Sequence, residues 1–124
     1  MIKRFGIIIA ETFIRFKKGG RGMDDVEQYV MELIADGGAA RSKAMEAIKS
    51  ARAGDIANAK NKLKEARQLV SKAHNIQTKL IVNEVSGNNM PVTLLMVHAQ
   101  DHLMNAMTIL DIAEELIVLY DKKF

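Results

Sequence analysis

The sequence predicts an all-α protein in which residues 23–124 form an antiparallel three-helix bundle. Two observations predict this fold class. Apolar residues recur at three- and four-residue steps along three long segments, which is the pattern of helices with one buried face. Two short breaks, at 53–55 and 86–91, contain residues that interrupt helices. Helices of about 28 residues are each about 42 Å long, so one such bundle encloses little core.

The first predicted helix begins at Asp24 or Asp25, whose carboxylate caps free amides at the positive end of the helix dipole. Gly37 and Gly38 lie in its middle, where small residues permit a close crossing with another helix. The apolar stripe of this helix consists of Val26, Val30, Leu33, Ile34, Met45 and Ile48.

The second predicted helix runs from about 56 to 85. Gly54 suits the left-handed conformation that ends the first helix, and Asp55 caps the second. Lysines and Arg67 occupy a face that we interpret as solvated. The residues expected to face inward are Ile56, Ala59, Leu63, Ala66, Val70, Ala73, Leu80 and Ile81.

The third predicted helix covers 92–120, with Pro91 near its start. It carries two apolar lines rather than one. Two lines predict two contacts, one within the subunit and one with copies of the same chain, and hence an oligomer. The first line is Leu103, Met107, Leu110 and Ile117, and the second is Ile109, Ile112, Leu116 and Leu119.

The most informative part of this helix is the sequence His-Ala-Gln-Asp-His at 98–102. A spacing of four places His98 and His102 on the same helix face, and Asp101 lies three residues from His98, within neighbouring reach. Gln100 is two residues from His98 and cannot share its face. Two imidazoles, a carboxylate and a carboxamide on about a turn and a half of helix indicate a candidate functional site.

The segment 95–104, Leu-Met-Val-His-Ala-Gln-Asp-His-Leu-Met, resembles the signature of the enzyme IIA proteins in the lactose and cellobiose/N,N'-diacetylchitobiose branch of the sugar phosphotransferase system. The resemblance also covers 38–42, 53–56 and 73–78, and it spans residues 24–122. It implies a homotrimer, a nine-helix bundle with the third helix lining the threefold axis. It also implies that sugar choice resides in a membrane component, so no direct sugar binding is expected.

The resemblance implies that His98 is the phosphoryl acceptor, which takes phosphate from the phosphocarrier protein HPr and passes it to a cognate enzyme IIB. A neutral imidazole with a pKa of about 6.5 is nucleophilic at cytoplasmic pH without a separate base. His102 is expected to be auxiliary: it orients His98, donates to the phosphoryl group or packs as a satisfied histidine. Gln100 either donates to a phosphoryl oxygen on a neighbouring subunit or is an ordinary polar surface residue.

Asp101 leads to a hypothesis about a metal ion, because Asn105, Thr108 and Ile112 follow it at helical steps into the second apolar line. Three symmetry-related carboxylates repel one another unless they are protonated or bridged by a cation. The resemblance implies Mg²⁺ or another divalent cation, bound by Asp101 from each subunit, and oxygen ligands suit so hard an ion. The alternative is that Asp101 holds His98 or His102 by a hydrogen bond.

The function predicted is therefore that of a phosphohistidine carrier for cellobiose/chitobiose-type disaccharide uptake, with a lactose-branch enzyme IIA as the alternative. Two other classes are more remote. A histidine phosphotransfer domain of a two-component relay usually has a lysine and a glycine shortly after its histidine, where this chain has Asp101 and His102. A non-catalytic metal-binding helical assembly has only His74 and Glu84 available on the second helix. His74 itself is expected to be structural.

Composition favours a cytoplasmic protein, because the chain of 124 residues has no cysteine, which fits a reducing compartment. Residues 1–22 carry a net charge of +5 and residues 23–124 a net charge of −2, and a slightly acidic body argues against nucleic acid as a partner. The apolar run near the N-terminus is too short to span a bilayer, so no membrane insertion is expected. We interpret residues 1–22 as an extension outside the family domain, either disordered or a mis-assigned start with translation beginning at Met23, because Lys18-Gly19-Gly20 can be encoded by a ribosome-binding sequence.

Overall fold

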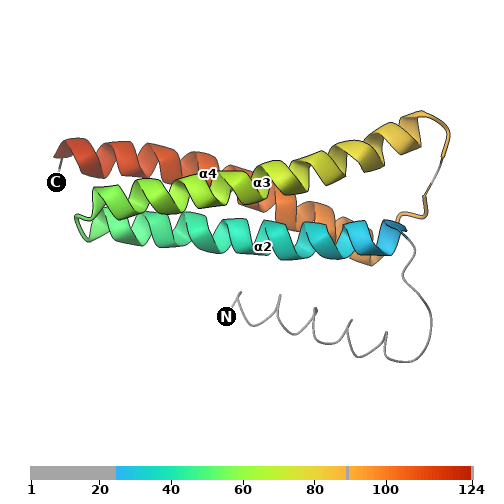
Figure 1. Cartoon of the computed structure of the whole chain (residues 1–124), viewed down its shortest axis with the longest axis horizontal. Helices are drawn as coiled ribbons and strands as arrows, with labels where there is room; N and C mark the ends of the chain where they lie inside the picture. The colour runs from blue at the N-terminus through green and yellow to red at the C-terminus, as the bar shows by residue number, and fades with distance from the viewer. Residues whose placement is uncertain (1–24, 89, 124) are drawn as a thin grey trace, which may run out of the picture.

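The computed structural model describes residues 25–88 and 90–123, which form three long helices (Figure 1). They are α2 (Asp25–Arg52), α3 (Ile56–Val85) and α4 (Leu94–Lys123). The chain runs along α2, back along α3 and forward again along α4, so α2 and α4 lie parallel and α3 is antiparallel to both. The predicted all-α three-helix bundle is confirmed. The predicted N-terminal extension at 1–22 lies outside the described residues.

The connection between α2 and α3 has the local structure that its sequence predicts. Gly54 has a φ of +88°, the left-handed conformation in which glycine carries no Cβ penalty. The Asp55 carboxylate accepts a hydrogen bond of 3.1 Å from the backbone N–H of Asn58 and thereby caps α3. The predicted bounds of α3 and its cap are confirmed.

The start of α4 differs by two residues from the predicted start at Val92. Thr93 Oγ1 accepts a hydrogen bond of 3.1 Å from the Met96 backbone N–H, and the Thr93 carbonyl accepts the N–H of Val97. Thr93 is therefore the N-cap, and helical structure begins at Leu94. Pro91 lies in the connection, before this cap.

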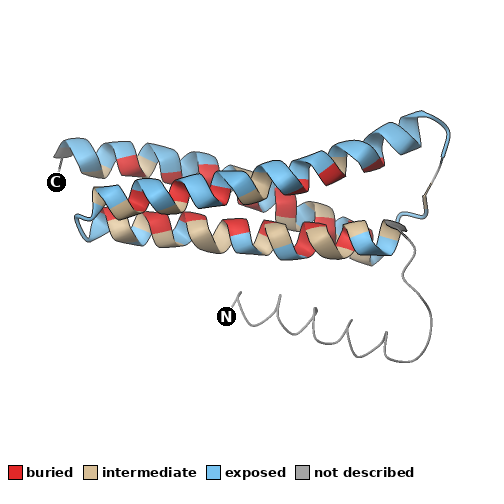
Figure 2. Ribbon diagram, in the orientation of Figure 1, coloured by how far each residue is buried: buried red, intermediate tan, exposed pale blue. Residues whose placement is uncertain are grey.

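The buried side chains form two clusters along the bundle, on the inward faces of the three helices (Figure 2). One cluster holds mostly large residues from the first half of α2, the second half of α3 and the first half of α4: Val30, Leu33, Ile34, Ala73, Ile76, Leu80, Met96, Ala99 and Leu103. The other is built mostly from alanine, which lets helix backbones approach closely: Ala44, Ala47, Ala51, Ala59, Leu63, Ala66, Leu110, Ala113 and Ile117.

Two predicted core positions are wrong. Ile81 is 54% exposed, and Ile76 is buried in its region of α3. Ile81 follows the buried Leu80 directly, and one residue turns a helix by about 100°, which carries its side chain out of the stripe. Met45 is exposed for the same reason, because its neighbour Ala44 takes the inward position.

The two apolar lines of α4 have different surroundings. Leu103, Leu110 and Ile117 are buried within the bundle, which confirms the predicted contact inside the subunit. On the second line, Ile112 and Leu119 are 47% and 45% exposed in the single chain. Within the described part of the chain, no helix has the length and apolar character needed to cross a membrane.

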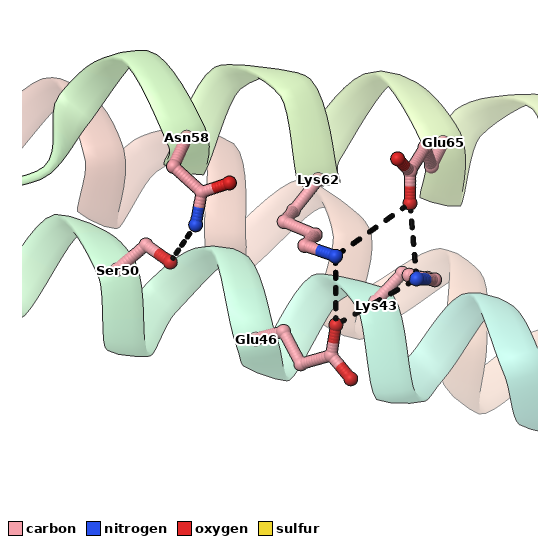
Figure 3. A network of polar contacts seen from close by, with 6 residues as sticks. All are labelled: Lys43, Glu46, Ser50, Asn58, Lys62 and Glu65. Carbon is pink, nitrogen blue, oxygen red and sulfur yellow. Dashed lines mark hydrogen bonds and ion pairs between the residues drawn. The ribbon is translucent and has the colours of Figure 1, made fainter.

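Four alternating charges connect α2 to α3 (Figure 3). Lys43 Nζ lies 3.0 Å from a Glu65 carboxylate oxygen, and Lys62 Nζ lies 3.5 Å from a Glu46 carboxylate oxygen. Lys43 also lies within ion-pair distance of Glu46, and Lys62 of Glu65, so each lysine contacts both carboxylates. Such pairs contribute little stability individually, but they favour one register of α3 along α2.

Glu65→Gln is expected to destabilise the protein slightly at neutral pH and not at acid pH. The hydrogen bond from Lys43, and next the Lys43 charge, lower the pKa of Glu65. A carboxylate whose pKa is lowered by folding stabilises the folded state above its unfolded pKa, and this contribution is lost as pH falls through the folded pKa. Urea denaturation at several pH values measures the difference from the unsubstituted protein.

The matched control is Glu115→Gln, because Glu115 is exposed on α4 and makes no ion pair with the residues described. A destabilisation by Glu65→Gln that persisted unchanged at acid pH would contradict the role assigned to this pair.

Candidate functional site

The helices α2 and α4 approach each other closely beside the histidine cluster. A Cβ atom built on Gly37 would lie 3.1 Å from the His102 carbonyl carbon and 3.2 Å from the Leu103 nitrogen. Both are backbone atoms, so α2 approaches α4 at a distance that a larger residue would prevent. The close helix crossing predicted at this glycine pair is confirmed. Gly38 faces the His102 side chain, with 3.9 Å between its Cβ position and His102 Nδ1.

His98 and His102 are in direct contact on one face of α4. Their Nε2 atoms are 3.0 Å apart, and their rings meet edge to face with centroids 4.4 Å apart. A hydrogen bond of this kind needs one nitrogen with its proton and one with its lone pair, so the contact is lost if both rings are doubly protonated. Both side chains are half-buried. The predicted shared face of the two histidines is confirmed.

The surroundings of His102 disfavour its charged form. Burial lowers the pKa of His102, and the charges of His98 and Arg41 lower it further, while Asp101 acts in the opposite direction. A neutral imidazole carries one N–H and one lone pair, so His102 can hold the neighbouring ring by donating or accepting a single hydrogen bond.

Gln100 turns from the histidine pair toward α3. Its Oε1 accepts a hydrogen bond of 2.8 Å from Gln77 Nε2, and its own Nε2 lies 3.8 Å from Met96 Sδ. The carboxamide is therefore held between the two helices, and Gln77, which the sequence analysis assigned no role, is its partner. The predicted contact between Gln100 and a phosphoryl group on another chain stays a prediction.

Asp101 and His74 are both exposed. Asp101 lies on the exposed side of α4, and its negative charge acts to raise the pKa of His102. Within residues 25–88 and 90–123 of one chain, no group of three His, Asp or Glu side chains is placed to hold a metal ion. His74 lies on α3, where its carbonyl accepts a hydrogen bond of 2.9 Å from Thr78 Oγ1.

Arg41 is a second residue that sequence reasoning missed. It lies within the segment 38–42 that carries part of the family resemblance, yet no role followed from its position in the sequence. In the fold its charge acts on His102 from α2, a different helix. Only the packing of α2 on α4 brings the two residues together.

Alanine substitutions at the two glycines are expected to change stability in opposite directions. Gly37→Ala places a methyl group against the backbone of α4, and overpacking of this kind costs about 1–3 kcal/mol. The higher helix propensity of alanine relative to glycine stabilises the helix by only about 1 kcal/mol. Gly38→Ala makes an ordinary contact with His102 and keeps that gain, so it should stabilise the protein by about 0.5–1 kcal/mol.

Urea denaturation of both variants measures these changes, and each variant is the control for the other. Stabilisation by both substitutions would show that the α2–α4 crossing can widen at little cost.

The comparisons with known proteins agree with this geometry. Residues 28–121 match the family model described as the lactose/cellobiose-specific IIA subunit of the PTS system. The lichenan-specific phosphotransferase enzyme IIA component of Bacillus subtilis is 54% identical over 99 residues, which are 80% of this chain and 90% of that protein.

Two solved structures share the fold. The cellobiose-specific enzyme IIA of Bacillus anthracis matches with a TM-score of 0.78 and 42% identity, over 82% of this chain and 93% of that one. A structure of the IIA(chitobiose)–HPr complex of Escherichia coli matches with a TM-score of 0.69 and 42% identity, over 81% and 97% of the two chains. The chain therefore belongs to the lactose/cellobiose-specific enzyme IIA family of the sugar phosphotransferase system, whose members are phosphotransferase components.

Proposed function

We propose that this chain carries a phosphoryl group on His98, accepting it from HPr and passing it to a cognate enzyme IIB. The observation that carries the proposal is the His98–His102 pair, held at 3.0 Å on α4 where α2 crosses it, in a chain of this family. The related chitobiose IIA protein, whose structure was solved in complex with HPr, supports HPr as the donor.

The chemistry needs a nucleophile, alignment and compensation of charge. A lone pair of the His98 imidazole forms the new bond to phosphorus, while the bond from phosphorus to the donor breaks and its electron pair leaves with the donor. His102, whose pKa is lowered by its burial, orients the His98 ring and offers an N–H to a phosphoryl oxygen. Gln100 is a further donor toward a neighbouring subunit in this proposal.

The proposed pathway is uptake of a cellobiose/chitobiose-type disaccharide, with a lactose-branch enzyme IIA as the alternative. The relatives described above are named for lichenan, cellobiose and chitobiose, which supports the first assignment. The chain itself binds no sugar in this proposal, and it acts in the cytoplasm.

Incubation with phosphoenolpyruvate, enzyme I and HPr tests the function. Intact-mass analysis at neutral or alkaline pH should show a single added phosphoryl group that is lost in acid, because a phosphorus–nitrogen bond is labile to acid. Omission of HPr should leave the mass unchanged. If the folded protein took up no phosphoryl group in the complete mixture, the carrier function would be wrong.

We also propose that the chain forms a trimer around the second apolar line of α4, with a divalent cation bound by Asp101 from each subunit. The exposed Ile112 and Leu119 support an apolar contact between copies, and the exposed Asp101 lies toward the N-terminal end of the same helix. One carboxylate is a poor site for a hard cation, but three copies supply enough oxygen ligands for Mg²⁺. The ion would neutralise the repulsion between the three carboxylates.

Sedimentation of the unsubstituted protein and three variants tests this assembly. Ile112→Asp should convert a trimer to monomers, whereas Val118→Asp, a matched change at an exposed position on another face of α4, should not. A chelator should weaken the unsubstituted trimer and have no effect on Asp101→Leu, in which an apolar group replaces each carboxylate. A monomeric native protein, or an Ile112→Asp variant that remained trimeric, would overturn the proposed contact.

A further inference from the structure

Arg41 lies on α2 one turn after the glycine pair that packs against His102. It follows Gly37 by four residues and Gly38 by three, so it lies on the face of α2 that meets α4. Side chains on a helix lean toward its N-terminus, which directs Arg41 back over the turn that holds the two glycines. That turn contacts His102, through its backbone at Gly37 and through its Nδ1 at Gly38.

The surroundings of Arg41 differ from those of Lys43 and Lys62, which are the other half-buried cations among the residues described. Lys43, Lys62, Arg67 and Lys72 each face a carboxylate on a neighbouring helix. Arg41 is half-buried and has no carboxylate within ion-pair distance among the residues described. Its charge instead acts on the His102 imidazole and contributes to lowering the pKa of that ring, which is itself in contact with His98.

A half-buried cation near the half-buried His102 imidazole is unfavourable unless an anion joins it. Guanidinium groups have a planar set of N–H donors that match the oxygens of a phosphoryl group, and they remain charged throughout the accessible pH range. A phosphoryl group on His98 carries negative charge next to this cation. Arg41 therefore lacks an anionic partner, and the proposed reaction places an anion, the phosphoryl group, on the nearby His98.

We propose that Arg41 binds the phosphoryl group carried by His98 and stabilises the phosphorylated form of the protein. This inference rests on the proposed function. On transfer, the His98 lone pair forms the phosphorus–nitrogen bond, the donor keeps the electron pair of the bond that breaks, and the guanidinium donates to phosphoryl oxygens without gaining or losing a proton. Arg41 is required for the strength of binding, and His98 alone forms the covalent bond.

The position of the phosphoryl-transfer equilibrium between HPr and this chain tests the proposal. Arg41→Gln should shift this equilibrium about ten-fold toward phosphorylated HPr, because hydrogen bonds to charged groups are the stronger ones. Arg41→Lys keeps the charge but not the planar set of donors, so it should recover only part of the shift. Arg52→Gln, a matched change at an exposed arginine in the last turn of α2, should leave the equilibrium constant unaltered.

Intact-mass analysis of both phosphorylated proteins gives the equilibrium constant, and thermal unfolding shows whether each variant is folded. A merely structural role for Arg41 would change stability or rate and leave the equilibrium constant within two-fold, which would overturn the proposal. The proposed function fails separately, since in that case the unsubstituted protein takes up no phosphoryl group. An Arg41→Lys variant as impaired as Arg41→Gln would contradict the charge-based role.

Discussion

His98→Ala is expected to abolish phosphoryl transfer to this protein. The alanine side chain has no lone pair that can attack phosphorus, and the remaining ring of the pair, His102, is half-buried with its Nδ1 facing Gly38 of α2. The variant should still fold, because His98 is only half-buried and lies outside both core clusters. Intact-mass analysis after incubation with phosphoenolpyruvate, enzyme I and HPr should show no added mass.

The other two histidines provide the matched comparisons. His74→Ala removes an exposed ring on α3 and should leave the rate and extent of phosphorylation unchanged. His102→Gln should still be phosphorylated, but about five-fold more slowly, because a neutral hydrogen bond contributes about 1 kcal/mol. Full phosphorylation of His98→Ala, together with its loss in His102→Gln, would move the acceptor to His102.

The sequence could predict the features of the fold that depend on local chemistry. Asp55 and Gly54 have side-chain and backbone preferences that act within a few residues, and both occupy the predicted cap and left-handed position. The spacing of His98 and His102 is likewise a local property of one helix. Helix ends without a strong local signal were less accurate, as at Thr93, where a single hydroxyl determines the start of α4.

Contacts between helices could be predicted only in part. Periodicity identified the buried stripes but not their edges, because one residue of error rotates a side chain by about 100°, as Met45 and Ile81 show. Arg41 lies 61 residues before His102 in the sequence, and Gln77 lies 23 residues before Gln100. Their roles depend on the alignment of one helix against another, which no local pattern specifies.

Leu103→Ala is expected to lower the free energy of unfolding by about 2–5 kcal/mol, the usual cost of opening a cavity at a large buried side chain. Leu103 has no exposed surface and, with Leu33, is one of the two largest fully buried side chains among the residues described. A domain is stable by only about 5–15 kcal/mol, so this single change removes a large share of the total. Urea denaturation at fixed protein concentration measures it.

The matched control is Leu94→Ala, the same substitution on the same helix at a side chain that is 85% exposed, where a change within about 0.5 kcal/mol is expected.

The comparison also bears on the site, because the Leu103 backbone nitrogen is one of the atoms that Gly37 approaches. Truncating the Leu103 side chain leaves that backbone contact in place, so the folded fraction of Leu103→Ala should still accept a phosphoryl group on His98. Equal destabilisation by the two alanine variants would contradict the core position of Leu103. A folded Leu103→Ala protein that accepted no phosphoryl group would instead show that the core side chain positions the histidine pair, in addition to stabilising the helix that carries it.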